Sequence, residues 1–427
     1  MRRLVLVFLL LAVLGGFLVA QEGFFKAEEI FPLVDRHVHA PSILELPNGD
    51  LLACWFEGSG ERKADDVAIM GARKLKGAKK WSEPFVMADT PGFPDINPVM
   101  FIDTQGRLWL MWYTVLTNLW ESSLLKYRNS YNYMMEEGPP EWAWQDVLHV
   151  RFDSLSEGIK ENDTFAKTLE TKLKSFIDRF LKEYKTLPGY TEEETKKLAG
   201  AFVQDILDKV WGKKACLKEG YPLLQRIGWQ TGNRPLIVGR NRLLVPLYSD
   251  GLEISIIAIS EDWGKTWTFS EPIVGIANIQ PALFLKSDGT LVAYMRNNGP
   301  YPRYLYVSES KKDGGITWSE VEYTDIPNPG SRADGIVLNN GHWVLVCNDT
   351  MDGRYRLTVM ISDDEGKTWK WKRSIESYDK GAGISVAYPS VYQGRDGLIH
   401  VVYSYHSPQG KTIKHAVFNE EWVMEGE

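Results

Sequence analysis

A short segment that recurs six times constrains the fold of this chain more than any other feature of its sequence. Each copy holds two apolar runs of about five residues separated by turn chemistry such as Asn-Gly or Asp-Gly, which is the pattern of a β-hairpin. The copies begin at Pro41, Pro98, Pro235, Pro281, Asp334 and Pro389. Five of the turns have a glycine at a matching position, namely Gly49, Gly106, Gly289, Gly341 and Gly397. We therefore expect six related hairpins.

A second motif follows some of these hairpins and sets the period of the repeat. Residues 260–267 and 362–369 match S-x-D-x-G-x-T-W, and residues 313–318 match its later part. In this motif, the Asp-box, the aspartate accepts hydrogen bonds from turn N–H groups, glycine takes a positive φ and tryptophan packs beneath. The closing residues Trp267, Trp318 and Trp369 recur every 51 residues. This period, with four strands per unit, predicts an all-β, six-bladed β-propeller over residues 21–427.

One segment, residues 164–213, departs from the repeat and predicts an α-helical hairpin inserted between blades 2 and 3. Apolar residues recur there at helical spacing, in one group from Leu169 to Leu181 and in another from Leu198 to Val210. Pro188-Gly189 separates the two groups, and Thr191 followed by Glu194 has the pattern of a capping box. The insertion is either a lid over the active face or a stabilising addition.

The first twenty residues predict an export signal. Arg2 and Arg3 precede an apolar run from Leu4 to Ala20, after which polar residues return, so cleavage is expected after Ala20. A retained membrane anchor is the alternative, although the run is short for a span. We expect a secreted or periplasmic protein with no stable membrane span after cleavage, and lipid or membrane retention stays open.

Composition excludes several classes of function. The formal net charge of −7 leaves no generally basic surface for nucleic acid. The three cysteines, at positions 54, 216 and 347, are too few for a disulfide scaffold and lack metal-binding spacing. The sequence has neither a nucleotide-binding motif nor HExxH, so we expect no metal and no cofactor.

Polar residues stand where the hairpins begin. Counting nine residues back from the turn glycines reaches Asn97, Gln280, Arg332 and Tyr388, and in the first copy it reaches Ala40, the neighbour of His39. Arg234 directly precedes the third copy. Because equivalent positions of different blades converge around the axis of a propeller, these side chains are expected to ring one mouth of the channel and to form a binding site.

Four segments make the chain similar to the sialidase (neuraminidase) superfamily across nearly all of its length except the helical insertion. They are GFPDINPVMFID from Gly92, QPALFLKSDGTLVAYMRNN from Gln280, RYRLTVMISDDEGKTW from Arg354 and AYPSVYQGRDGLIHVVYSY from Ala387. The resemblance implies that Arg296 and Arg354 bind a substrate carboxylate through bidentate hydrogen bonds. It also implies that Tyr388 attacks the anomeric carbon, and that Asp65 or Asp66, of which one faces the channel, is the acid/base.

The sequence departs from the family pattern at two positions. His39-Ala40-Pro41 stands where the family has Arg-Ile-Pro, so a histidine replaces one of three expected arginines. Gln280 stands where the family has the glutamate that activates the tyrosine, and a neutral amide cannot take a proton. Glu121 is a candidate replacement for that base, or else it binds a sugar hydroxyl.

Two histidines and two arginines have alternative interpretations. His37 and His39 lie two residues apart on a predicted strand and share a face, where they act as acid/base or substrate-binding groups or else only as hydrogen-bonded strand histidines. Arg62 and Arg332 either line the site or carry solvated loop charges.

The combined reading predicts an exported, sialidase-like exo-glycosidase that removes a terminal acidic sugar from glycans. One alternative is a propeller lyase on uronate-containing glycans, in which His39 and Tyr388 abstract a proton beside a carboxylate that is neutralised by arginine. The other is a non-catalytic propeller that binds acidic glycans. In all three cases the partner is an acidic glycan, and no nucleic acid is expected.

Overall fold

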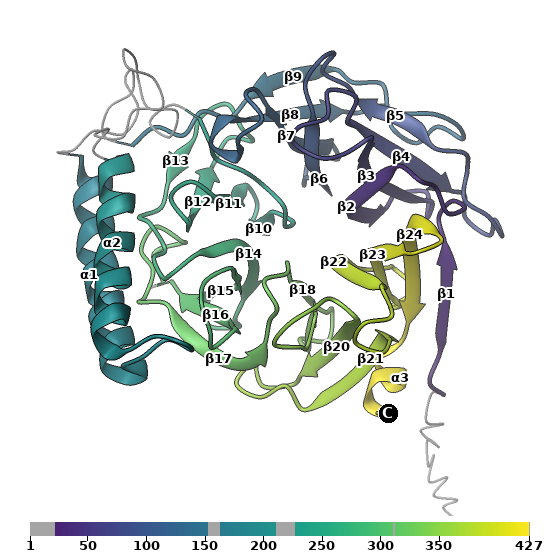
Figure 1. Ribbon diagram of the computed structural model, residues 1–427. Helices are drawn as coiled ribbons and strands as arrows, with labels where there is room; N and C mark the ends of the chain where they lie inside the picture. Colours follow the sequence, from purple (N-terminus) through teal and green to yellow (C-terminus); the bar gives the residue numbers. More distant parts are fainter. Residues whose placement is uncertain (1–21, 153–162, 211–226, 311, 427) are drawn as a thin grey trace, which may run out of the picture.

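The computed structural model describes residues 22–152, 163–210, 227–310 and 312–426. Six antiparallel four-stranded sheets surround a central axis like the blades of a propeller (Figure 1). The predicted six-bladed fold with a helical hairpin is confirmed. The export signal predicted for residues 1–20 lies outside the described residues. No helix among the described residues is long and apolar enough to cross a membrane.

Each blade takes consecutive strands, except the last, which combines the two ends of the chain. Blades 1 to 3 consist of β2 (His37–Glu45), β3 (Leu51–Gly58), β4 (Ala68–Lys74) and β5 (Phe85–Ala88); β6 (Asp95–Ile102), β7 (Leu108–Val115), β8 (Ser123–Ser130) and β9 (Trp144–Val147); and β10 (Leu236–Val238), β11 (Arg242–Ser249), β12 (Ile254–Ser260) and β13 (Thr268–Phe269). A short 3-10 helix, η1 (Trp120–Ser122), precedes β8.

The remaining blades follow the same plan. Blades 4 and 5 consist of β14 (Asn278–Leu285), β15 (Leu291–Asn297), β16 (Tyr304–Glu309) and β17 (Glu322–Pro327); and β18 (Asp334–Val337), β19 (Trp343–Cys347), β20 (Arg356–Ser362) and β21 (Trp371–Ser377). Blade 6 has β22 (Ser385–Gln393), β23 (Ile399–Ser407), β24 (Gly410–Phe418) and β1 (Phe25–Glu29), and α3 (Glu420–Met424) follows it.

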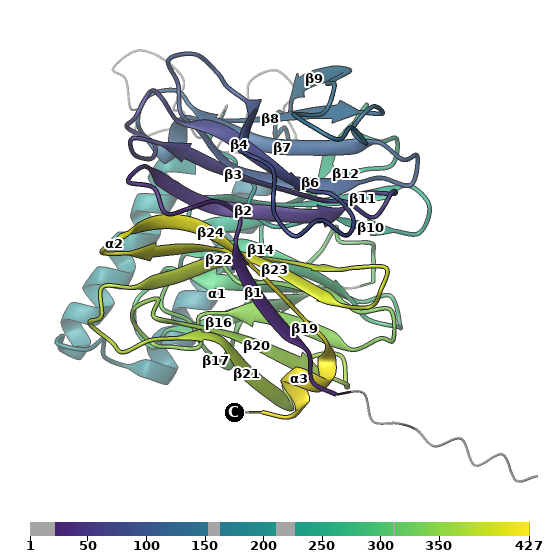
Figure 2. The ribbon, with the colours of Figure 1, turned by 90° about the vertical axis from the view of Figure 1, so that its right-hand side faces the viewer.

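The N-terminal strand β1 closes the ring by pairing with β24, so the first and last strands of the described chain lie in one sheet (Figure 2). A buried polar chain supports this closure. The Glu28 carboxylate on β1 lies 3.2 Å from His415 Nδ1, and His415 Nε2 lies 3.0 Å from His400 Nδ1. Lys74 of blade 1 also donates to Glu28. The closure therefore joins blade 1, blade 6 and the N-terminal strand through complementary charge.

The repeated S-x-D-x-G-x-T-W loops hold the third and fourth strands of a blade together. The Asp262 carboxylate accepts hydrogen bonds from the Thr266 backbone N–H at 2.9 Å and from its hydroxyl at 2.6 Å. Asp364 accepts the same pair from Thr368, both at 2.8 Å. Gly264 and Gly366 have φ values of 82° and 80°, in the region that favours glycine. The bonds are those expected from the sequence motif.

The helical hairpin packs on the outer rim of the propeller, where Figure 1 shows α1 (Thr164–Tyr184) and α2 (Glu192–Val210) beside β13 and β17. The apolar face of α1 buries Phe176 against Tyr306 and Tyr323, with ring centroids 6.1 and 6.5 Å apart. The predicted capping box of α2 is present, because Thr191 N donates to Glu194 Oε2 at 2.8 Å and Glu194 N donates to Thr191 Oγ1 at 3.2 Å. This position is that of a stabilising addition rather than a lid over the channel mouth.

Candidate active site

One end of the propeller axis holds a cavity of about 390 Å³. Its walls come from the starts of the first strands of several blades and from the loops between second and third strands, which lie at the same end. The lining residues are His39, Glu61, Ile96, Asn97, Tyr113, Trp120, Tyr248, Asp250, Gln280, Arg296, Asn298, Arg354 and Tyr388. All six blades contribute at least one of them, as the convergence argument predicts.

A repeated backbone feature aims the first-strand side chains into this cavity. Ala40, Asn97, Gln280 and Tyr388 have φ values of 52°, 50°, 56° and 58°, although none is glycine. Each lies where the register shifts between the first and second strands of its blade. Such bulges redirect a side chain, and a left-handed residue of this kind costs on the order of 1 kcal/mol. The same strained geometry at four equivalent positions indicates that the fold stores strain at this mouth.

The Tyr388 hydroxyl is surrounded by hydrogen-bond donors. Arg296 Nη1 donates to it at 2.8 Å, and Gln280 Nε2 lies 3.5 Å away. The guanidinium of Arg354 lies 5.3 Å from the centroid of the tyrosine ring. The Gln280 carbonyl oxygen accepts from Arg296 Nη1 at 3.3 Å, which turns the Gln280 amide nitrogen toward the tyrosine. Tyr388 thus joins the two predicted arginines in one cluster.

These donors change the acidity of the tyrosine. Burial alone would raise the pKa of Tyr388, but the positive charges of Arg296 and Arg354 and the Gln280 hydrogen bond outweigh it, so the pKa lies below its ordinary value. The phenolate is the stronger nucleophile and becomes more accessible near neutral pH. The two arginines and Gln280 therefore favour the phenolate form of Tyr388 without a carboxylate beside it.

His39, which stands where the resemblance leads us to expect a third arginine, lines the cavity next to Tyr388. Its ring centroid lies 4.1 Å from that of Tyr388, and its Nδ1 lies 2.8 Å from Ser404 Oγ. Burial lowers the pKa of His39 well below its usual value, and the positive charges of His406 and Arg354 lower it further. His39 is therefore neutral at physiological pH, and it offers a substrate a hydrogen bond rather than an ion pair.

The floor of the cavity is a network of uncharged polar groups. Asn97 Nδ2 donates to the hydroxyls of Tyr113 at 3.0 Å and Tyr248 at 3.1 Å. Gln280 Nε2 reaches the Tyr248 hydroxyl at 3.3 Å. Burial raises the pKa of both Tyr113 and Tyr248, so these two remain neutral, unlike Tyr388. The network fixes the side chains of Asn97 and Gln280 next to Tyr388.

Two cavity carboxyls, Glu61 and Asp250, were not among the residues expected from the sequence. Glu61 lies on the β3–β4 loop, 3.4 Å from His37 Nε2. Asp250 follows β11 and is positioned by its backbone N–H, which donates to Gln230 Oε1 at 3.2 Å. Burial raises the pKa of Asp250, whereas the charge of Arg296 lowers it in part.

The sequence could have indicated the cavity residues that lie at the ends of the second strands. Seven residues after the turn glycine stand Tyr113 in the second hairpin and Arg296 in the fourth, and seven after Asn241 of the third turn stands Tyr248. Asp250 lies two residues farther along, in the turn after β11, where strand alternation no longer applies. The second strand thus places cavity residues by the same convergence as the first. Glu61 lies in a loop for which no such count applies.

The predicted aspartates lie elsewhere. Asp65 and Asp66 are exposed in the turn before β4 and not on a strand, so the expectation that one of them faces the channel does not hold. Asp66 accepts hydrogen bonds from Ser59 N at 3.0 Å and Ser59 Oγ at 2.7 Å and closes its own loop. Neither carboxylate lines the cavity.

Three further predicted residues lie near the cavity without lining it. Glu121 lies in η1 beside the lining residue Trp120. The Arg62 guanidinium lies 4.8 Å from the centroid of Trp120, at the rim. The His37 ring lies 5.7 Å from His39, between centroids, and contacts the cavity through Glu61.

Arg332 and Arg234 do not line the cavity, contrary to the expectation that they form part of the site. Arg332 is neither site-lining nor solvated, because it is 1% exposed and its guanidinium donates to backbone carbonyls of Pro41, Tyr388 and Pro389, each at 3.1 Å, and to Gly232. It lies 5.1 Å from the Tyr388 ring centroid and supports that residue from beneath. Arg234 donates to the Ile43 carbonyl at 3.0 Å and lines a separate cavity of about 170 Å³.

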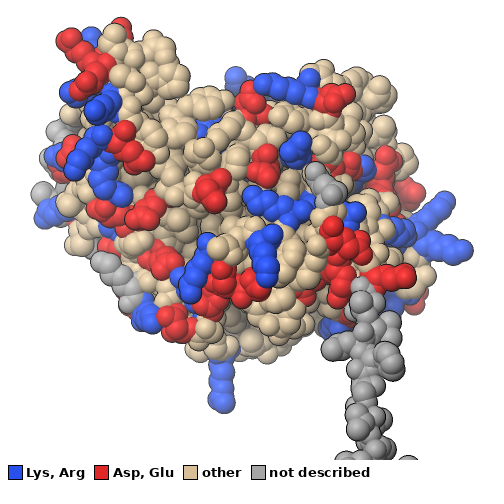
Figure 3. All heavy atoms as spheres, turned by 90° about the horizontal axis from the view of Figure 1, so that it is seen from below, with Lys and Arg blue, Asp and Glu red and all other residues tan. Residues whose placement is uncertain are grey.

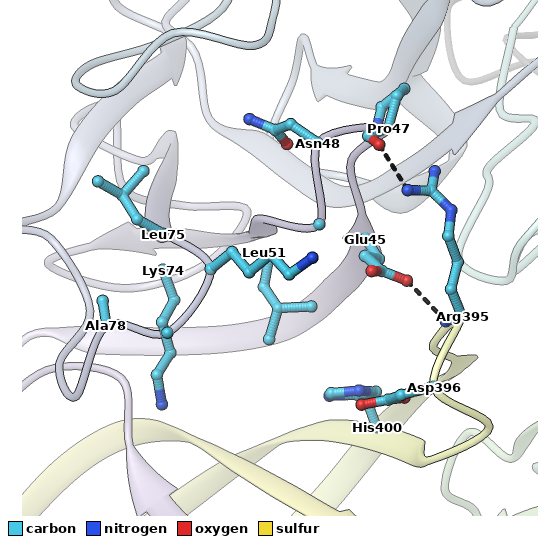
Figure 4. Close-up of a pocket in the computed structure, with 13 residues that line it drawn as sticks. Glu45, Pro47, Asn48, Leu51, Lys74, Leu75, Ala78, Arg395, Asp396 and His400 are labelled. Carbon is cyan, nitrogen blue, oxygen red and sulfur yellow. Dashed lines mark hydrogen bonds between the residues drawn. The ribbon is translucent and has the colours of Figure 1, made fainter.

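A larger hollow, of about 440 Å³, lies at the opposite end of the blades, where the β2–β3 and β4–β5 turns meet the β22–β23 turn. Figure 4 shows Arg395 joined to Glu45 and Pro47 there, next to Asp396 and His400. None of the site residues predicted from the sequence lines this hollow. The clustered arginines and the tyrosine make the smaller cavity the candidate active site.

No metal cluster among the described residues competes with this assignment. Within the described ranges, no three His, Cys, Asp or Glu side chains are grouped to hold a metal ion. The face shown in Figure 3 mixes acidic and basic side chains over its whole extent. The two arginines beside Tyr388 favour an anionic ligand in this cavity.

The comparisons with known proteins decide the family. The BNR repeat-like domain matches residues 49–165 and 208–401, which is more than half of the chain. The chain belongs to the BNR repeat-like family. This assignment and the propeller fold confirm the resemblance to the sialidase superfamily. No curated protein sequence matches the chain.

Solved structures similar to this BNR repeat-like propeller share its fold at low identity. A protein of unknown function from Dyadobacter fermentans is 14% identical, with a TM-score of 0.62, covering 92% of this chain and 99% of that one. The NanB sialidase from Streptococcus pneumoniae is 13% identical, with a TM-score of 0.62 and coverages of 93% and 71%. A Trypanosoma rangeli sialidase in complex with 2,3-difluorosialic acid, a covalent intermediate, is 12% identical, with a TM-score of 0.60 and coverages of 92% and 58%.

Proposed function

We propose that this protein is an exported glycoside hydrolase that releases a terminal acidic sugar, with Tyr388 as the nucleophile. The observation that supports this most is the cluster in which Arg296 Nη1 lies 2.8 Å from the Tyr388 hydroxyl while Arg354 covers the same ring. Two guanidinium groups beside one buried tyrosine form a receptor for a carboxylate and activate a phenolate at the same time.

The reaction proceeds in two displacements. The Tyr388 phenolate oxygen attacks the anomeric carbon and the bond to the leaving oxygen breaks, which produces a tyrosyl glycoside. Glu61 and His37, 3.4 Å apart at the mouth, share the proton that the leaving oxygen takes up. Water then attacks the anomeric carbon, the pair accepts its proton, and the tyrosine oxygen leaves as phenolate. The released sugar retains its anomeric configuration.

The neighbouring sialidases support this assignment by their chemistry. The Trypanosoma rangeli structure is described as a covalent intermediate with 2,3-difluorosialic acid, so a propeller of this fold forms a bond to an acidic sugar. In this chain the glutamine at position 280 leaves the tyrosine without an adjacent carboxylate, and the arginines carry more of the activation.

The test combines trapping with kinetics. Full-length protein is incubated with 2,3-difluorosialic acid and with the corresponding fluorinated forms of other sugar acids, and the digested peptides are analysed by mass spectrometry. We expect one adduct on Tyr388, and a loss of about a thousandfold or more in kcat/KM on aryl glycosides for Tyr388→Phe. Tyr392→Phe is the matched control, because Tyr392 lies on the same strand but lines the separate cavity beside Arg234. An adduct at another residue, or full activity in Tyr388→Phe, would refute the proposal.

A lyase is the second candidate because a neutral base stands next to the tyrosine. His39 is uncharged and its ring lies 4.1 Å from that of Tyr388, so the pair suits removal of a proton beside a uronate carboxylate bound by Arg296 and Arg354. Unsaturated products that absorb in the ultraviolet, formed from uronate-containing glycans, would favour the lyase. Binding of acidic glycans without either product would favour a non-catalytic propeller.

A further inference from the structure

The candidate active site carries opposite charges on different walls. Arg296 and Arg354 come from blades 4 and 5, beside Tyr388 of blade 6. Asp250 comes from blade 3, which lies opposite blade 6 in the ring, and Glu61 comes from blade 1. A ligand whose carboxylate lies on the arginines therefore directs its remaining substituents toward a wall that ends in carboxyl oxygens.

Asp250 has no cationic partner of its own. Glu61 has His37 at 3.4 Å, but within the described part of the chain no lysine, arginine or histidine nitrogen comes within 4.0 Å of the Asp250 carboxylate. Arg296 is the positive charge that lowers the pKa of Asp250 most, but its guanidinium already donates hydrogen bonds to Tyr388 and, at 2.7 Å, to Asn298. A partly buried carboxyl that faces a cavity without a cationic partner is stabilised by hydrogen-bond donors from the ligand.

The cavity also lacks free apolar surface. Apart from tyrosine rings, only Ile96 and Trp120 among its lining residues are apolar. Ile96 is 1% exposed, and the guanidinium of Arg62 lies 4.8 Å from the Trp120 ring centroid and covers that face. The ring of Tyr388 is flanked by His39 and Arg332. An acyl methyl group on the sugar would therefore displace water from polar groups without gaining an apolar contact.

We propose that Asp250 binds hydroxyl groups of the acidic sugar, and that the site selects a polyhydroxylated sugar acid over its N-acylated counterpart. The proposal rests on the proposed function, because it needs the carboxylate of the sugar on Arg296 and Arg354. Asp250 then accepts hydrogen bonds from hydroxyls on the far side of the ring, and its backbone bond to Gln230, which is fully buried, holds it in that position. Asp250 is a specificity-determining residue in this arrangement.

The test measures binding rather than turnover, so its outcome does not depend on the hydrolytic step. Free N-acetylneuraminic acid and the analogue with a hydroxyl in place of the acetamido group are titrated into the full-length protein by calorimetry. We expect the hydroxyl analogue to bind about tenfold more tightly or better, because its O–H donates to the Asp250 carboxylate without bringing a carbonyl oxygen and a methyl group against the polar wall. In Asp250→Asn the ratio of the two dissociation constants should fall to about threefold or less.

The matched control is Glu121→Gln, which removes a nearby carboxylate that does not line the cavity and should leave the ratio unchanged. Equal or tighter binding of the N-acetyl sugar, or a ratio of dissociation constants that Asp250→Asn leaves unaltered, overturns the selectivity proposal. Neither outcome contradicts binding of the sugar carboxylate by Arg296 and Arg354. Failure of both sugars to bind overturns this proposal and the acidic-sugar assignment together. Binding with the expected ratio, but without hydrolysis of any aryl glycoside, supports the selectivity and refutes only the catalytic assignment.

Discussion

Arg332 provides the sharpest test of how the fold positions Tyr388, the proposed nucleophile. Its guanidinium lies beneath Tyr388 and donates to main-chain carbonyls of Pro41 in blade 1, Gly232 before blade 3, and Tyr388 and Pro389 in blade 6. The bonded carbonyls include that of Tyr388 itself, which has a φ of 58°. Arg332→Met keeps much of the side-chain volume but removes all of these donors.

The expected cost follows from the carbonyls that lose their donor. A buried acceptor without a partner costs about 1–3 kcal/mol, and three of the four bonds share one nitrogen, so the costs are not additive. Asp334, which is 3% exposed, also loses one of its two nearby cations. Removing one member of such a buried charged network costs about 3–5 kcal/mol. Arg234→Met also removes a cation near Asp334, but it breaks one hydrogen bond to a carbonyl, that of Ile43, rather than four, so it should cost less than Arg332→Met, about 1–3 kcal/mol.

The assay is urea denaturation followed by tryptophan fluorescence, with both variants measured beside the wild type. We expect the free energy of unfolding to fall by about 3–5 kcal/mol in Arg332→Met, and kcat/KM to fall as Tyr388 leaves its strained conformation. Loss of no more stability than in Arg234→Met would refute the view that Arg332 supports the tyrosine.

Three further predictions concern charge. In Gln280→Glu a carboxylate lies beside the Tyr388 hydroxyl and should raise the pKa of the tyrosine, so the acidic limb of the pH profile of kcat/KM moves to higher pH. Carbon NMR of labelled tyrosine measures that pKa directly. An acidic limb and a tyrosine pKa that both stay unchanged would contradict activation by the arginines. Arg354→Lys keeps the charge but loses the planar fork, so KM for an acidic sugar should rise about tenfold while that for its neutral amide changes little. The pKa of His400 is lowered to about 3, so the unfolded state takes up a proton as the pH falls below about 6.5 and native stability falls by up to about 1.4 kcal/mol per pH unit. His400→Gln should flatten that slope between pH 6 and 4 in urea titrations, and an unchanged slope would exclude His400 as its source.

The fold could be predicted from the sequence because the motifs that specify it repeat at a fixed spacing along the chain. Each blade repeats the same hairpin, and the closing tryptophans 51 residues apart exclude architectures without a fixed repeat. The count back from the turn glycines reached Asn97, Gln280 and Tyr388, which line the cavity, because the same bulge occurs at each of these strand starts. In blade 5 the same count reached Arg332, whose long side chain turns below the cavity to satisfy carbonyls.

The remaining site residues lie in loops, where the length and path of the loop, rather than strand alternation, decide which way a side chain points. Asp65 and Asp66 were expected on a strand, but the chain forms a turn there, and Asp66 bonds to Ser59. Glu61, four residues before Asp65, enters the cavity instead. Asp250 follows a strand end in the one blade whose turn has asparagine in place of glycine, so the register of that hairpin was not marked in the same way.

The central claim is that Arg296, Arg354 and Tyr388 act on one ligand. A crystal structure of Tyr388→Phe with a soaked sugar acid tests it most directly. The account predicts the sugar carboxylate within 3.2 Å of guanidinium nitrogens of both arginines, with the anomeric carbon next to the position of the missing phenol oxygen. A sugar that lies in the hollow beside Arg395, or whose carboxylate contacts neither arginine, would contradict it.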